Sequence, residues 1–422
     1  MGTKPNSQPA RVLVVDAVRG AAVLCMIQWH CADAWIGGPL RDGEAFRWTR
    51  IVGGFAAPLF LLLAGVSAAL VFRPERVWSG VRRGLGIIVG GYAFKLFAWA
   101  VDYGALVERR NWLAIALDAA LLFTLWRAVQ EKIDPKRRAL LAGLACFFWL
   151  GTWFALNGTS RTPTLVARLD VLQGIGAALV VVNLALFVVR RHTALVMTLL
   201  AIAVALMTPS FIGVDLPMPT RLADYVARTT LDTAQGARFS LFPWAAYTLL
   251  GAAIGSAARA RPIASPWDVP FVRRGAIALV IGGLGAFLLF EPNATAQWFL
   301  VRSEQTRNLI RLLWNTSIAI AFAGLGALIL PRLSALQRVV LSLGRHSLVV
   351  YVVHLEISWG LLCSPIRQTF GFGAWALWTS VLTAAMIALS LWLDHREAPR
   401  DGTRDRRTNR RADDRAGSTF LS

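Results

Sequence analysis

The segment FAAPLFLLLAGVSAALVF (residues 55–72) contains eighteen residues and no charged side chain. An apolar run of this length crosses about 30 Å of hydrocarbon when it forms a helix. Comparable runs occur at 171–189 and 275–290, and all three carry the Gly and Ala that let helices pack closely in a bilayer. The chain is 56% hydrophobic over 422 residues. The sequence therefore predicts an all-α fold, a polytopic transmembrane helix bundle.

About 10–12 spans are expected, since each needs roughly 20 apolar residues. They are placed at 13–36, 51–72, 84–104, 112–128, 139–156, 171–189, 193–208, 239–258, 275–291, 311–330, 346–363 and 373–393. Arginine-rich segments separate alternate spans, and Lys and Arg accumulate in cytoplasmic loops. Twelve spans with both termini in the cytoplasm satisfy this rule, and we expect the inner membrane of a bacterium.

Three regions follow from this layout. Residues 1–12 form a short cytoplasmic segment, and 13–393 form the membrane domain. The tail 394–422 holds eight arginines and six acids with few apolar residues, so we expect it to be disordered and solvated beside anionic lipid. No long polar stretch is available for a soluble catalytic domain, so any chemistry must take place inside the bundle.

The net charge of +20 does not indicate nucleic-acid binding. The arginines are spread over short segments between apolar runs, and no zinc finger or Gly/aromatic RNA motif occurs. The four cysteines lie in or beside apolar runs without CxxC spacing, so we interpret them as small buried side chains. No metal site is expected.

The first span carries four polar residues that lipid should exclude: Asp16, Arg19, His30 and Asp33. Arg19 and His30 are eleven positions apart, which places them within about 20° of one helix face and about 16 Å apart along the axis. Asp16 is one turn from Arg19 and Asp33 is one turn from His30, so each acid is expected to pair with its neighbour. Alternatively, Arg19 is a structural or snorkelling residue and His30 an interfacial one.

This span also carries a resemblance. RVLVVDAVRGAAVLCMIQWH (11–30) looks like the start of integral-membrane acyltransferases, in which an Arg, ten residues and a His occupy the first helix. Four later blocks resemble the heparan-α-glucosaminide N-acetyltransferase catalytic-domain family, in the same order. These blocks are GFAAPLFLLLAGVSAAL (54–70), RLDVLQGIGAAL (168–179), FSLFPWAAYTLLGAAIG (239–255) and LGRHSLVVYVVHLEI (343–357).

The resemblance implies transfer of an acetyl group from cytoplasmic acetyl-CoA to a sugar across the membrane. In that reading Arg19, with Asp16, suits the CoA phosphates, and His30, oriented by Asp33, suits a general base or an acyl carrier. The family's lysosomal enzyme is associated with a histidine in the first lumenal loop, and the corresponding segment 37–50 has none. Direct transfer and a covalent acyl-histidine therefore both stay open.

A second polar stripe lies at 344–358. Ser347, Tyr351, His354 and Ser358 share one helix face. Arg345 precedes them at the cytoplasmic end, where an anion is favourable. We expect Arg345, Ser347, Tyr351 and His354 to contact the donor, with His354 about 12 Å into the membrane beside the pantetheine arm. Interhelical hydrogen bonding is the alternative for this stripe.

Arg168, Asp170 and Gln173 stand at the outer end of the sixth span and are expected to contact the acceptor, unless Arg168 and Asp170 only form a structural pair. Lys95 and Asp118 are isolated charges that could pair with each other.

The leading interpretation is an acetyl-CoA-dependent membrane acyltransferase acting on an amine or hydroxyl of a glycan or glycolipid. A transporter or flippase for a small anion or lipid-linked sugar is the alternative, although the chain shows no internal repeat. A structural membrane protein would not need the polar array of the first span. A homo-oligomer is among the open options.

Overall fold

The computed structural model describes residues 13–107, 170–211, 239–259, 269–290 and 304–397, together with the single positions 137 and 226. Within these residues the regular elements are helices, and the one β-type pairing is an isolated bridge between Ile36 and Phe370. The all-α fold predicted from the apolar runs is confirmed.

The helices follow one another along the chain with short connections wherever two neighbours are both described. They are α1 (Leu13–Trp35), α2 (Glu44–Gly53), α3 (Ala56–Val71), α4 (Val77–Val107), α8 (Val171–Val188), α9 (Thr193–Met207), α11 (Leu241–Arg259), α12 (Val269–Phe290), α14 (Glu304–Ile329), α15 (Ser334–Arg345), α16 (Ser347–Trp359) and α17 (Phe372–Glu397). Short 3-10 turns include η2 (Pro74–Arg76), between α3 and α4, and η5 (Leu361–Ile366), between α16 and α17.

Seven helices of the described residues are long and apolar enough to cross a membrane, or eight if α15 and α16 together make one span. Helices α4 and α12 coincide with two further expected spans, 84–104 and 275–291. The spans expected at 112–128 and 139–156 lie outside the described residues. The expected continuous span 346–363 is wrong: α16 has only 13 residues and meets α15 at an angle of 82°.

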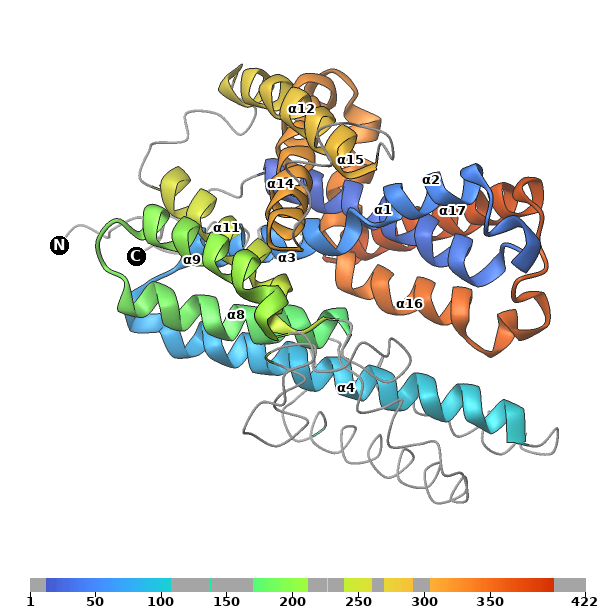
Figure 1. Ribbon diagram of the computed structural model, residues 1–422. Coiled ribbons are helices and arrows are strands. Elements are labelled where there is room, and N and C mark those ends of the chain that lie inside the picture. The colour runs from blue at the N-terminus through green and yellow to red at the C-terminus, as the bar shows by residue number, and fades with distance from the viewer. Residues whose placement is uncertain are drawn as a thin grey trace, which may run out of the picture.

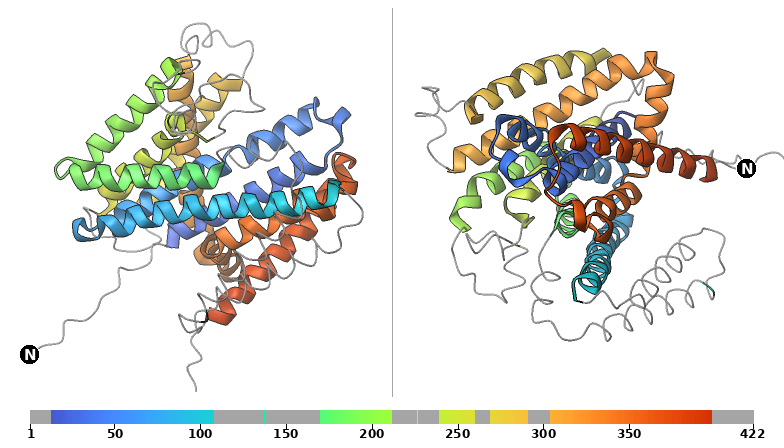
Figure 2. Two further views of the ribbon diagram at one scale, coloured as in Figure 1. Left: turned by 90° about the horizontal axis from the view of Figure 1, so that it is seen from below. Right: turned by 90° about the vertical axis from the view of Figure 1, so that its right-hand side faces the viewer.

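The helices form one bundle in which neighbours in sequence are often neighbours in space. Helix α12 packs on α14, α11 on α3 and α9, α4 on α8, and α1 on α15. Figure 1 shows α4 and α8 side by side along one flank, whereas α1, α2, α16 and α17 gather at the other end. The views in Figure 2 show the same pairing of α4 with α8 and of α12 with α14. The bundle therefore leaves α16 facing α1 on one side and α17 on another.

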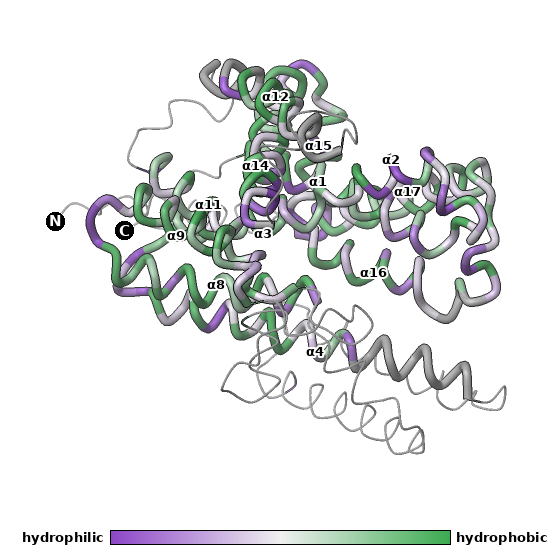
Figure 3. Tube along the Cα trace, in the orientation of Figure 1, coloured by the Kyte–Doolittle hydropathy of each residue, from purple (hydrophilic) through white to green (hydrophobic). Residues whose placement is uncertain are grey.

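Polarity follows the helix ends. Figure 3 shows apolar residues along most helices, while hydrophilic residues concentrate in connections such as the one between α8 and α9. That connection carries Arg190, Arg191 and His192. This is the distribution expected of helices whose sides meet lipid and whose ends meet water.

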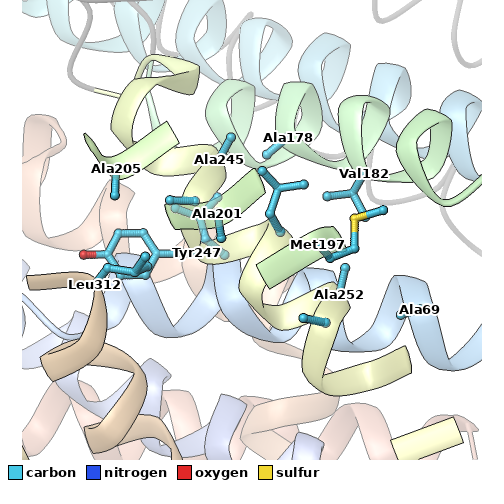
Figure 4. Close-up of a cluster of buried hydrophobic side chains, with 14 of the residues drawn as sticks. Ala69, Ala178, Val182, Met197, Ala201, Ala205, Ala245, Tyr247, Ala252 and Leu312 are labelled. Atoms are coloured by element: carbon cyan, nitrogen blue, oxygen red, sulfur yellow. The ribbon is translucent and has the colours of Figure 1, made fainter. Parts of the chain in front are cut away.

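One core cluster is built mainly from small residues of α8, α9 and α11 (Figure 4). It includes Ala178, Ala201, Ala205, Ala245 and Ala252, with Met197 and Leu312 filling the larger gaps. Small side chains let helix axes approach closely, which is how helices gain van der Waals contact where lipid supplies no hydrophobic drive. This cluster packs together the helices on the side of the bundle that lies away from α16.

The crossing of α1 with α15 depends on two glycines. A Cβ on Gly20 would overlap the carbonyl oxygen of Val340, and a Cβ on Gly344 would overlap the carbonyl oxygen of Asp16. Backbone therefore meets backbone at this crossing, which only glycine permits. The contact brings the start of α16 to the level of Asp16 and Arg19.

The elbow between α15 and α16 is fixed to the end of α17. Arg345 Nη1 donates to the Asp394 carboxylate at 2.7 Å, and His346 Nε2 lies 3.1 Å from the same oxygen. Helix α17 runs to Glu397, so it extends past the boundary expected at 393. The first residues assigned to the polar tail therefore belong to the bundle.

Candidate active site

As their spacing on α1 predicts, Arg19 and His30 both line the same cavity, which is partly open to the outside. Arg19 donates from Nη1 to the Asp16 carboxylate at 3.0 Å and from Nη2 to the Ser67 hydroxyl of α3 at 3.1 Å. Asp16 is buried, whereas part of the Arg19 side chain stays accessible. The predicted Asp16–Arg19 pair therefore forms, and it holds a cation in the cavity wall.

His30 contacts a second histidine, His354 of α16, across 324 positions of sequence. His30 Nδ1 lies 2.8 Å from His354 Nε2, and His354 Nδ1 lies 2.6 Å from the carbonyl oxygen of Val350, one turn earlier. The rings are inclined by only 5°, with centroids 5.1 Å apart. Each nitrogen lies one ring radius from the centroid of its own ring, so the centroids are farthest apart when both nitrogens lie on the line that joins them. The observed separation is close to that maximum. The rings therefore lie edge to edge in nearly one plane, with the hydrogen bond pointing from ring to ring.

The two rings differ in access. His354 is fully buried, and only His30 of the pair lines the cavity. The Tyr351 ring packs edge-on against both imidazoles, at centroid distances of 6.5 Å to His30 and 6.0 Å to His354. His354 lies behind His30 and contacts that ring, so its expected direct contact with the donor arm is not a contact that the cavity wall offers and stays an untested prediction.

The cavity has a volume of about 1120 Å³. This slightly exceeds the range of about 300–1,000 Å³ that is usual for small-molecule and cofactor sites. Its walls come mainly from α1, α3, α4, α8 and α16, so helices from both ends of the sequence enclose it. A long ligand can lie along it between Arg19 and His30.

One end of the cavity is lined by arginines from several segments. They are Arg19 of α1, Arg73 and Arg76 between α3 and α4, Arg83 of α4, and Arg345 at the end of α15. Guanidinium groups bind phosphate through paired N–H donors and stay charged at any physiological pH. This end is therefore suited to a polyanionic group.

The antiparallel order of the helices brings these arginines together. The side chain of Trp29 fills the space beside Gly53, just before α3, whereas Arg19 reaches Ser67, near the end of α3. The end of α3 and the start of α4 therefore lie at the level of Arg19. The opposite end of α3 lies at the level of His30, so arginines and histidine occupy different ends of one space.

The second predicted stripe divides between the cavity and the interior. Arg345, Ser347 and Tyr351 line the cavity, as expected for donor contacts. Ser358 is buried and donates from its hydroxyl to the carbonyl of Leu355 at 3.3 Å. Arg345 also keeps its ion pair with Asp394, so a carboxylate behind it holds the guanidinium at the cavity wall.

Asp33 does not orient His30. Its carboxylate accepts a hydrogen bond from Arg41, whose guanidinium also lies 5.0 Å from the centre of the Phe46 ring. Asp33 still lines the cavity at the His30 end. The expected His30–Asp33 pair is replaced by His30–His354, because Arg41 folds back from the following connection and takes the carboxylate.

The predicted acceptor residues take different positions. Asp170 caps α8, where its side chain accepts from the Val171 amide at 2.8 Å, and it lines the cavity. Gln173 completes the capping box by accepting from the Asp170 amide at 3.3 Å, and it is fully buried. Lys95 lies 3.9 Å from Asp170. Asp118, its expected partner, and Arg168 lie outside the described residues.

Four charged residues of the cavity were not expected as ligand contacts. Arg73, Arg76 and Arg83 were used only to assign a cytoplasmic loop, and Glu356 was not assigned a role. A cluster of arginines directly after an apolar run is the signal that could have indicated the first three. No local signal marks Glu356, because its place depends on how α16 packs against α1 and α17.

The arrangement can support acid–base or nucleophilic chemistry at one ring nitrogen. His30 Nδ1 is engaged with His354, so Nε2 is the nitrogen available to a molecule in the cavity. Among the described residues, no group of three or more His, Cys, Asp or Glu side chains is arranged to hold a metal ion. The cavity residues that the structure describes offer an imidazole nitrogen toward one end and guanidinium cations at the other.

The comparison with known families agrees with this geometry. The family described as "Acyltransferase domain" matches residues 12–395, which is nearly the whole membrane bundle. The chain belongs to this acyltransferase family. A search of the curated proteins finds no match. The protein is therefore a membrane acyltransferase by family.

Proposed function

We propose that this acyltransferase moves an acetyl group from cytoplasmic acetyl-CoA to a hydroxyl or amine of a glycan or glycolipid on the other side of the membrane. The observation that carries the proposal is the single cavity, with five arginines at one end and His30 at the other. The bacterial inner membrane, with both termini in the cytoplasm, is part of the proposal and is supported by the arginine-rich connections.

The arginine end is assigned to the donor phosphates. A CoA thioester carries its phosphates at one end and its acyl group at the other, joined by the pantetheine arm. Arg73, Arg76 and Arg345 would bind phosphate oxygens through charge-assisted hydrogen bonds, and Arg19 would contact the arm or its pyrophosphate. About 16 Å of helix separates Arg19 from His30, so the arm would carry the thioester to the ring.

His30 is assigned to the transfer step. In the direct route, Nε2 takes the proton of the acceptor O–H or N–H while the acceptor atom bonds to the acyl carbon. The carbon–sulfur bond then breaks, and the CoA thiolate takes the proton back from the imidazolium to leave as a thiol. In the covalent route, Nε2 attacks the acyl carbon and the carbon–sulfur bond breaks, which leaves an acylated ring and a CoA thiolate. The acceptor atom then attacks the same carbon, the carbon–nitrogen bond breaks, and the acceptor's proton neutralises the thiolate. Both routes need the same unprotonated nitrogen.

The far end of the cavity is assigned to the acceptor. Asp170 and Glu356 supply carboxylate groups there, and Trp29 and Trp359 supply aromatic surface. Carboxylates accept hydrogen bonds from hydroxyl and ammonium groups, as a glycan or amino sugar would offer. The sequence blocks that resemble the heparan-α-glucosaminide N-acetyltransferase catalytic domain support the same acceptor class.

The test uses purified protein in lipid nanodiscs, labelled acetyl-CoA and a glycolipid extract of bacterial membranes. The expected result is label in the glycolipid fraction with one thiol of CoA released per acetyl group transferred. The His30→Ala variant should show neither, whereas Arg82→Ala, an exposed arginine that does not line the cavity, should show both. Absence of label and of thiol release with the wild-type protein would overturn the proposal and favour a transporter.

A further inference from the structure

The contact between His30 and His354 determines more than the position of two rings. Each neutral imidazole has one nitrogen that donates and one that accepts, and the bond made by one nitrogen decides the state of the other. The chain of contacts runs from the Val350 carbonyl to His354 Nδ1, and from His354 Nε2 to His30 Nδ1. The positions of the protons on both rings can therefore be derived by starting from the Val350 carbonyl, whose role in the chain is fixed.

The fixed end is the Val350 carbonyl, which only accepts hydrogen bonds. The 2.6 Å contact therefore requires a proton on His354 Nδ1. A fully buried ring is costly to charge, so His354 is neutral and its Nε2 carries a lone pair. His354 Nε2 can therefore only accept a hydrogen bond. Because it lies 2.8 Å from His30 Nδ1, the donor of this bond is the N–H of His30 Nδ1.

We propose that His354 is a positioning residue that holds His30 in the tautomer with Nδ1 protonated and Nε2 bare and facing the cavity. The inference rests on the proposed function, since a bare Nε2 is what either transfer route uses. No other hydrogen bond reaches the His30 ring from the part of the chain that the structure describes. His354 thus does the work that the sequence suggested for Asp33.

The same bond also acts during the transfer step. When His30 Nε2 takes the acceptor proton, the ring becomes a cation and its Nδ1–H bond to His354 becomes charge-assisted and stronger. His354 accepts this bond without becoming protonated itself, as the orienting residue of a serine-protease triad does. The near-coplanar geometry means that His30 need not turn when its charge changes.

The experiment compares three variants of the full chain in nanodiscs. His354→Leu removes the acceptor, whereas His354→Gln can place its amide oxygen near the former Nε2. Ser358→Ala changes a buried polar residue one turn along the same helix, which does not line the cavity. Removing the partner that orients a metal-bound histidine costs about 10- to 100-fold, and we take the same order for a partner that orients an unliganded ring. We expect that loss in kcat for the Leu variant with unchanged affinity for CoA, partial recovery for the Gln variant, and wild-type kcat for Ser358→Ala.

The tautomer is measured directly by solid-state NMR of ¹⁵N-histidine protein, in which five histidines give a small set of signals. The His30 signals are assigned from their loss in His30→Ala. The expected wild-type spectrum shows His30 with a protonated Nδ1 and a bare Nε2, and His354→Leu should add the Nε2-protonated form. A wild-type His30 protonated on Nε2, or wild-type kcat in the Leu variant, would overturn the proposal. This spectrum needs no turnover, so it decides the role of His354 even where the transfer assay fails.

Discussion

At one end of the cavity, five arginines come from four segments of the chain and each keeps part of its surface accessible. At the other end, one 2.8 Å hydrogen bond joins His30 to a fully buried His354. Several long cations can share a flexible polyanion, so the loss of one is partly compensated by the others. A single ring nitrogen has no such substitute. Variants at the two ends should therefore differ in kind: graded losses of affinity at the arginines and a steep loss of turnover at His30.

The largest effect is expected for His30→Ala. Removal of a general base typically lowers the rate by a factor of about 10²–10⁴, while the arginine end keeps its donor contacts. Turnover and CoA affinity should be measured on the same preparation, by thiol release and by calorimetry. Turnover close to wild type would remove His30 from the reaction, and loss of CoA affinity would show that the two ends are not separate.

The next effect is expected for Arg19→Ala and Arg345→Ala. Each arginine would lose charge-assisted hydrogen bonds of about 1.5–3 kcal/mol, which corresponds to roughly 10- to 100-fold weaker donor binding. The rate at saturating donor should stay near wild type, because His30 is untouched. A loss of kcat at unchanged donor affinity in either variant would contradict the division between the two ends.

A smaller effect on CoA binding is expected for Arg83→Ala, which is compared with Arg82→Ala. Arg82 and Arg83 are adjacent exposed residues of α4, and only Arg83 lines the cavity. Arg83→Ala should weaken CoA binding at low salt and lose this effect as ionic strength rises, because exposed charges are screened beyond about 10 Å at 0.1 M salt. Arg82→Ala serves as the matched control. Equal effects of the two substitutions would mean that general surface charge, and not the cavity, attracts the donor.

The smallest effect is expected for Asp33→Asn. Asp33 accepts from Arg41 and not from His30, so its charge is not part of the chain of hydrogen bonds at the ring. A change of only ~0.5 kcal/mol, about twofold in kcat, is expected for a substitution outside such a network. The comparison is with His354→Leu in the same assay. A larger loss for Asp33→Asn than for His354→Leu would return the orienting role to Asp33.

The sequence was sufficient for those features that depend on local periodicity. Uncharged apolar runs predict the helices, and the helical period places Arg19 and His30 on one face of α1, where both line the cavity. The Asp16–Arg19 pair is also local, because a carboxylate and a guanidinium one turn apart can reach each other without help from another element.

The contacts that the sequence did not predict depend on tertiary packing. His354 reaches His30 only because α15 and α16 meet at 82° and α15 packs backbone to backbone on α1. The spacing of one helical turn predicts a pair between Asp33 and His30, but Asp33 accepts a hydrogen bond from Arg41. Arg41 lies in an irregular connection, and helical periodicity does not predict where its side chain lies. Lys95 likewise pairs with Asp170 across the α4–α8 contact. Each of these contacts depends on how separate elements meet in space, which local periodicity does not specify.

The central claim is that one cavity holds the donor phosphates at the arginines and the thioester at His30. A structure of the His30→Ala variant in nanodiscs with acetyl-CoA bound tests it most directly, since this variant should bind the donor without consuming it. The account predicts phosphate density among Arg73, Arg76 and Arg345, with the thioester carbonyl beside position 30. Phosphate density at the Asp170 end, or acetyl-CoA bound outside the cavity, would contradict it.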